Sequence, residues 1–92
     1  MHDVLIHREG DHVGVAVRDI AAGETVEGVA MDTGARVRLS AREAIPLGHK
    51  IALCRLPKGS PVLEYRAQIG IATADIEVGE WVHVHNIRSA RW

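Results

Sequence analysis

The 92 residues of this chain are enough for one domain with one modest core, and we expect a single domain over residues 1–92. A domain of this size buries only ~60% of the surface that its unfolded chain exposes, so size alone favours a partner, either another protein or a second copy of the chain. The 11 Lys and Arg against 12 Asp and Glu leave a net charge of −1, without the basic field or the aromatic side chains that nucleic-acid binding requires.

Cysteine content and the N-terminus point to the cytosol. The single cysteine, Cys54, has no partner for an internal disulfide and lies in an apolar stretch, where we expect an inert core thiol. The chain begins with His2 and Asp3 in place of a charged region followed by an apolar run, so the sequence predicts neither a signal peptide nor a membrane span. His2, His7 and His12 have no partner spacing and are predicted to be solvated.

Alternating aliphatic residues predict strands in the first half of the chain. Val13, Val15 and Val17 would fall on one face of a strand, and Val37 and Leu39 repeat the pattern. The β-branched residues and the nine glycines favour short strands and tight turns over helices.

Three segments share one spacing: an aliphatic residue, two residues, Gly, two residues and Val. Glycine at the same place in each indicates a turn with positive φ between two strands, and so predicts three similar corners. Asp19 and Asp75 stand just before the first and third segments, which favours turn capping over acid–base chemistry. The segments are Ile20-Ala-Ala-Gly23-Glu-Thr-Val26, Leu56-Pro-Lys-Gly59-Ser-Pro-Val62 and Ile76-Glu-Val-Gly79-Glu-Trp-Val82.

One helical signal interrupts the strand pattern. Ser40-Ala-Arg-Glu43 has the spacing of a capping box, in which Ser40 and Glu43 would each satisfy a free backbone N–H. Pro46 would end the helix, so we expect about one turn near residues 40–45. The sequence therefore predicts a compact all-β domain of seven or so short strands with one short helical turn.

The first of two polar clusters is His49-Lys50, which follows a Pro-Leu-Gly turn. Its cation would suit a carboxylate, although the same pair would equally begin an exposed strand. The sequence has no nucleophile elbow and no glycine-rich phosphate loop opening a helix. We therefore expect no complete catalytic set in this chain.

The second cluster lies near the C-terminus. As a strand it would place Trp81, His83 and His85 on one side, while Val82 and Val84 pack inward. Successive side chains on one side lie ~6.6 Å apart, close enough for both imidazoles to address one ligand, anion or metal ion. Two histidines are too few for a closed structural metal site, which usually has four ligands. A shared metal or substrate site, an interface and a solvated strand face all stay open.

Taken together, these segments form a longer pattern that resembles a known family. The likeness covers nearly the whole chain. The motif that ends in His-Val-His-Asn is long and ordered, and it is therefore quite specific. The matching segments are Val13-x-Val15-Ala16-Val17-Arg18-Asp19-Ile20-x-x-Gly23, Ile45-Pro-Leu-Gly-His-Lys-Ile-Ala-Leu53, the Gly59 turn and Ile69-Gly70-x-Ala72-x-x-Asp75-Ile76-x-x-Gly79-Glu80-x-Val82-His83-Val84-His85-Asn86. They resemble the N-terminal SAF domain of altronate and galactarate dehydratases, and the small subunit of sulfolactate sulfo-lyase, where that domain is a separate chain. One departure is Tyr65-Arg66, where the family has Tyr-Gly, which puts the shape of that loop in question.

The resemblance implies a fold of the β-clip type and a lyase assembly whose large catalytic subunit holds most of the active site. Members act on an acid sugar or a related 2-hydroxy acid, commonly with iron(II) or manganese, and eliminate water or sulfite. We expect no metal in this chain alone, although His83 and His85 could reach one in the complex. The positions that match the family motif, expected to border the substrate or the interface, are His49, Lys50, His83, His85 and Asn86.

The chain ends at Trp92, where fused enzymes would continue into a linker, which favours a separately encoded subunit over a fragment of a longer enzyme. We expect the small subunit of a hydro-lyase of the altronate dehydratase type, inactive by itself. Two alternatives stay open: the small subunit of a sulfolactate sulfo-lyase, and a stand-alone SAF module that binds a carbohydrate or carboxylate. Altronate, galactarate and sulfolactate all carry a carboxylate beside a hydroxyl, so the sequence does not choose among them.

Overall fold

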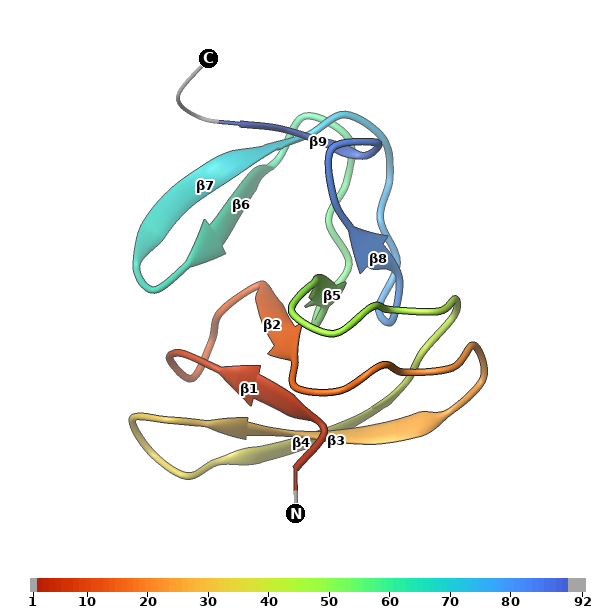
Figure 1. Cartoon of the computed structure of the whole chain (residues 1–92). Helices are drawn as coiled ribbons and strands as arrows, with labels where there is room; N and C mark the ends of the chain where they lie inside the picture. Colours follow the sequence, from red (N-terminus) through yellow and green to blue (C-terminus); the bar gives the residue numbers. More distant parts are fainter. Residues whose placement is uncertain (1, 90–92) are drawn as a thin grey trace.

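The structure, a computed structural model, describes residues 2–89, which form short strands joined by turns and contain no helix (Figure 1). The prediction of an all-β domain is therefore confirmed, and no helix in this part of the chain is long and apolar enough to cross a membrane. Nine strands are present in place of the seven or so expected. They are β1 (Val4–Ile6), β2 (Val13–Ala16), β3 (Thr25–Ala30), β4 (Arg36–Ser40), β5 (Lys50–Ala52), β6 (Pro61–Glu64), β7 (Ala67–Ala72), β8 (Trp81–Val82) and β9 (Ile87–Ser89).

The strands form two sheets, one of six strands in the order β4-β3-β1-β2-β5-β8 and one of three in the order β6-β7-β9. Neighbouring strands are antiparallel except β1 and β3, which run parallel. The small sheet lies at the end of the molecule opposite the N-terminus (Figure 1).

The buried apolar residues divide into two clusters, and strands β5 and β8 contribute to both. Ile51 belongs to the first cluster and Ala52 to the second. Trp81 packs against the first cluster, and Val82 lies in the second. Because side chains alternate along a strand, these two short strands hold the two halves of the molecule together.

Four corners join the strands, one more than predicted. Gly23, Gly59 and Gly79 have φ angles of 88°, 88° and 90°, which confirms the three predicted turns. Gly48 forms a fourth corner with a φ angle of 83°. The predicted pattern missed it because Ile51 stands there in place of the final Val.

The corners lock together in two pairs through backbone hydrogen bonds. Each corner glycine donates its N–H to the carbonyl oxygen of a buried alanine that precedes the facing corner. The N–H of this alanine donates in turn to the carbonyl oxygen of the residue that follows the glycine. Isolated bridges between Ile20 and Ile45, and between Leu56 and Ile76, complete the two pairs. In the sequence, each alanine lies four residues before the aliphatic residue that begins the next corner. The repeated segment therefore starts four residues earlier than predicted. The alanines are Ala16, Ala41, Ala52 and Ala72.

Asp19 and Asp75 cap turns, as predicted, although each caps the corner that faces its own. Asp19 Oδ1 accepts a hydrogen bond of 2.8 Å from the Leu47 N–H, and Asp75 Oδ1 accepts one of 2.8 Å from the Lys58 N–H. Both carboxylates are therefore explained by the pairing of corners.

The predicted helical turn near residues 40–45 is not formed. Ser40 ends β4, and the backbone of Ala41 pairs with the first corner, donating to Glu24 O and accepting from Gly23 N. Because the N–H and C=O of Ala41 are bound to this distant segment, they cannot form the hydrogen bonds of a helix. The carboxylate of Glu43 instead reaches another part of the chain, described below.

The loop between β6 and β7 keeps a tight two-residue turn although it lacks glycine. Glu64 pairs with Ala67, and the two loop residues, Tyr65 and Arg66, have φ angles of 56° and 64°. Positive φ at both positions is the geometry of a type I′ hairpin turn, which favours Gly at the second position. The departure at Arg66 is therefore absorbed as strain, and the turn is retained.

Arg66→Gly is expected to stabilise the protein by about 0.5–1 kcal/mol, because glycine adopts the left-handed region without a Cβ penalty. Tyr65→Gly is the matched control. It relieves the same backbone strain but loses the ring that lies under the Arg8 guanidinium at 4.9 Å and beside His7 at 5.7 Å. Urea unfolding should give a higher midpoint for Arg66→Gly only, and a lower midpoint for that variant would contradict the strain argument.

The β6–β7 hairpin packs against the loop that follows β1. Two histidines of this loop, predicted to be solvated, therefore have partners. His12 Nδ1 accepts a hydrogen bond of 3.0 Å from the Leu63 N–H, and His7 packs against the Tyr65 ring. Their isolation in the sequence gave no sign of these contacts, because both partners are more than 50 residues away.

Candidate functional site

Four aromatic side chains gather where β8 meets the residue that precedes β5. β8 pairs antiparallel with β5, which places Trp81 opposite Ile51. His49 comes just before β5, and the turn after β8 carries His83 and His85. The structure thus unites three of the predicted histidines from two segments of sequence.

Trp81 is the centre of this cluster. Its indole Nε1 donates a hydrogen bond of 3.1 Å to His49 Nδ1, and the two ring centres are 5.5 Å apart. The His83 ring stacks almost parallel to the indole, with an interplanar angle of 6° and a centre-to-centre distance of 5.4 Å. His85 lies 5.2 Å from the indole in a tilted arrangement, and His49 and His83 are 4.9 Å apart.

The backbone of Trp81 is held by two side chains. Glu43 Oε2 accepts a hydrogen bond of 3.0 Å from the Trp81 N–H, and Asn86 Nδ2 donates one of 2.7 Å to the Trp81 carbonyl oxygen. Glu43 was predicted to cap a helix, so its link to the site was missed. A carboxylate that binds a backbone N–H 38 residues away leaves no pattern in the sequence.

The histidine-rich segment forms a turn instead of the predicted strand. β8 ends at Val82, and Asn86 closes the turn by accepting a hydrogen bond of 2.9 Å from the His83 N–H at its Oδ1. Val84, predicted to pack inward, is 81% exposed, and that prediction is wrong. The imidazoles of His83 and His85 do both reach Trp81, but the turn brings them there and strand alternation does not.

Asn86 is the one buried polar residue among those described, at 8% exposure. Both ends of its side-chain amide are used by the turn and by β8. Its position in the motif is therefore explained by the shape of the turn that presents the histidines.

Lys50 lies apart from the other predicted site residues. It stands opposite Val82 in the pair of β5 with β8, whereas Trp81 stands opposite Ile51. Because side chains alternate across a strand, Lys50 projects to the side of the sheet away from the indole. The two neighbours His49 and Lys50 therefore belong to opposite faces.

The cluster by itself does not fit a metal ion. Within residues 2–89, no group of three or more His, Cys, Asp and Glu side chains is arranged to hold one. His49 uses Nδ1 for the indole, while His83 and His85 are exposed in the turn. Two exposed imidazoles can add to a site built mainly by another chain but do not form one alone.

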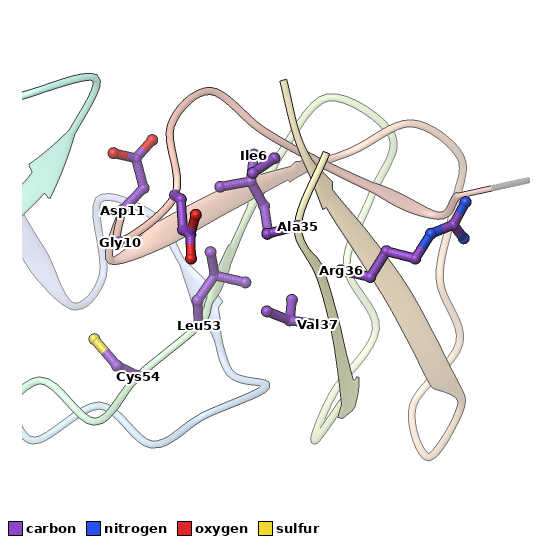
Figure 2. A pocket seen from close by; sticks show the side chains of 10 residues that line it. Ile6, Gly10, Asp11, Ala35, Arg36, Val37, Leu53 and Cys54 are labelled. Atoms are coloured by element: carbon purple, nitrogen blue, oxygen red, sulfur yellow. The ribbon is translucent and has the colours of Figure 1, made fainter. Parts of the chain in front are cut away.

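A separate cavity of about 320 Å³ lies beside the β3–β4 hairpin, away from the histidines, and Figure 2 shows Ile6, Val37 and Leu53 around it. Cys54 stands at its edge, half-buried, and burial raises the pKa of its thiol. A raised pKa disfavours the reactive thiolate, which agrees with the inert thiol expected from the sequence. This cavity is lined by apolar side chains and by the charged residues Glu9, Asp11 and Arg36, and none of the predicted site residues lines it.

Comparison with known proteins gives a family match over almost the whole chain. Residues 2–90 match the altronate/galactarate dehydratase SAF domain. The alpha subunit of (2R)-sulfolactate sulfo-lyase from Chromohalobacter salexigens is 37% identical over 91 residues, which cover 98% of this chain and 97% of that subunit. Altronate dehydratase from Bacillus subtilis is 35% identical over 86 residues, covering 94% of this chain and 16% of the enzyme.

A second altronate dehydratase, from Escherichia coli, is 39% identical over 79 residues, covering 86% of this chain and 15% of that enzyme. The sulfo-lyase subunit is thus matched along nearly its full length, whereas both dehydratases are matched over one small part. The relatives agree in being lyases or subunits of lyases, and the all-β fold is the one expected of this domain. The chain belongs to the family of SAF domains found in altronate and galactarate dehydratases.

Proposed function

We propose that this chain is the small subunit of a two-part lyase that eliminates water, or alternatively sulfite, from a 2-hydroxy acid. The observation that carries the proposal is the group of three imidazoles around Trp81 in a member of this lyase family, two of them on an exposed turn. Such a group can bind and orient an anionic substrate. It lacks the complete set of groups that an elimination needs.

The first candidate reaction is dehydration of a sugar acid such as altronate. It is supported by the family match and by two altronate dehydratases of 35% and 39% identity. The second candidate is release of sulfite from sulfolactate. It is supported by the alpha subunit of sulfolactate sulfo-lyase, a separate subunit that this chain matches over 97% of its length.

A large catalytic subunit is the partner that we propose. In the altronate dehydratases the matched segment is only 16% or 15% of the enzyme, so most of each enzyme lies outside this domain. We place the divalent metal, iron or manganese, in that partner. His83 and His85 would border the shared site from this side.

The chain alone is expected to show no elimination of water from altronate or of sulfite from sulfolactate, because it lacks an evident base and a full metal site. Co-expression with a large subunit of this lyase family should give a complex that turns over one of the two acids. Release of the 2-keto acid product and of sulfite can be assayed in parallel. Turnover by the small chain alone would contradict the proposal. Tight binding of altronate by the chain alone, with no large chain co-purifying, would favour a stand-alone binding module.

The exposed valine of the histidine turn offers a test of the proposed interface. Val84 is 81% exposed between two histidines, so a partner that contacts His83 and His85 must cover it. Val84→Asp is expected to weaken association with the large subunit about tenfold or more, since it places an unpaired charge in the interface. The midpoint of unfolding of the isolated chain should stay unchanged.

Met31→Asp is the control for this test. Met31 is 62% exposed and follows β3, away from the histidine turn, so the same charge there should leave association unchanged. Affinities can be measured by calorimetry or surface binding. Equal affinities for Val84→Asp and Met31→Asp would show that the histidine turn does not face the partner.

A further inference from the structure

We infer that Trp81 is a positioning residue that fixes His49 as a neutral imidazole with its Nε2–H directed to the substrate carboxylate. The role of Trp81 rests on the structure of this chain, and the identity of the ligand rests on the proposed function. Trp81 stands at a position that the family motif leaves open, so the motif alone does not assign it a role.

The hydrogen bond between the two rings determines where the His49 proton lies. An indole N–H is a donor only, so His49 Nδ1 must be the acceptor in the 3.1 Å contact. A neutral imidazole carries one proton, which then sits on Nε2. His49 is thereby left with one donor to offer, and its Nε2 has no hydrogen-bond partner within residues 2–89.

Trp81 is rigid enough to impose this arrangement. It lies opposite Ile51 on the edge strand β8, and the neighbouring Glu80 carbonyl accepts from the Ala52 N–H, so the backbone groups of Trp81 itself point away from β5. The outward N–H and C=O of Trp81 would have no strand to pair with at this edge of the sheet. Glu43 and Asn86 bind them, and the indole packs against the first core cluster.

The ligand class follows from what a fixed N–H donor can recognise. A carboxylate accepts hydrogen bonds and donates none, and its bonds to N–H donors are stronger than neutral ones. The 2-hydroxy acids of both candidate reactions carry such a group. His83, stacked on the same indole and 4.9 Å from His49, lies within reach of the same anion.

The hydrogen bond itself can be measured without a substrate. In the uniformly ¹⁵N-labelled chain, a scalar coupling between Trp81 Nε1 and His49 Nδ1 should be detected across the hydrogen bond, with the His49 proton on Nε2. Trp81→Phe keeps a ring against the core but removes the donor, and should abolish the coupling. A missing coupling in the unaltered chain, or a proton on Nδ1, would overturn the inference whatever the enzyme does.

The kinetic test uses the reconstituted complex with altronate and with sulfolactate. Trp81→Phe is expected to raise KM about tenfold while kcat changes less than about twofold, because a donor to the carboxylate contributes equally before and during the reaction. In the His49→Ala background, the same substitution should raise KM no further, since Trp81 acts through His49.

The outcomes separate the two proposals. An additional rise of KM caused by Trp81→Phe in the His49→Ala background would show that Trp81 does not act through His49, and the inference would fall. An unchanged KM in the single variant would overturn it as well. A complex that turns over neither acid would contradict the proposed function. The coupling measured in the isolated chain would then be the only test of whether Trp81 positions His49.

Discussion

Replacing His83 or His85 by Ala in the reconstituted complex is expected to lower kcat about 10²-fold. A positioned proton donor or acceptor contributes on this order to a rate, and both imidazoles are exposed on one turn beside Trp81. The folded chain should be unaffected, because neither side chain lies in the core. Steady-state kinetics with the reactive acid give the rate, and calorimetry gives the affinity between subunits.

His2→Ala is the matched control, since His2 precedes β1, which two strands separate from β8 in the six-stranded sheet. It should change neither rate nor affinity. A normal rate with weakened association would make His83 and His85 interface residues. A normal rate with normal association would make them a solvated surface and remove them from the site.

The sequence predicted the members of this site better than it predicted their arrangement. His49, His83 and His85 were selected, and the structure brings them together. Strand alternation was expected to bring His83 and His85 together, whereas a turn closed by the side chain of Asn86 does so. A hydrogen bond from a side chain to nearby backbone can turn the chain without any change in the pattern of apolar residues. A prediction from alternation uses that pattern alone and so does not detect the turn.

Two further features of the site have other physical causes. Lys50 follows His49 directly, but adjacent residues of a strand face opposite ways, so Lys50 lies on the other side of the sheet from the indole. Glu43 fitted a local capping pattern, but the extended backbone of Ala41 was already paired with the first corner. Contacts with distant segments therefore decided the place of Glu43, and local alternation decided that of Lys50.

The corners show what a short repeat can and cannot reveal. A glycine with positive φ is visible in the sequence because few other residues adopt that conformation, and three corners were found in this way. The alanines that receive the glycine N–H groups were missed. They are buried where two corners pair, and that pairing is a property of the fold.

Gly79→Ala is expected to destabilise the protein by about 3 kcal/mol or more, against about 1 kcal/mol for Gly59→Ala. The two glycines have nearly equal φ angles, 90° and 88°, so the cost of left-handed backbone is shared. They differ in their surroundings. A Cβ at Gly59 would enter open space, whereas one at Gly79 would overlap the backbone carbonyl oxygen of Ser40. Backbone cannot move aside as a flexible side chain can, so the Gly79 corner itself would have to shift.

That shift would reach the site, because Trp81 follows Gly79 by two residues and the Gly79 carbonyl accepts a hydrogen bond of 2.9 Å from the Arg42 N–H. Urea unfolding of both variants measures the difference in stability, with equal m-values required for the comparison. The coupling between Trp81 and His49 should survive in Gly59→Ala and be lost or weakened in Gly79→Ala. Equal destabilisation by the two substitutions would mean that the contact between the Gly79 corner and Ser40 is looser than the structure has it, and Trp81 would then be held by Glu43 and Asn86 alone.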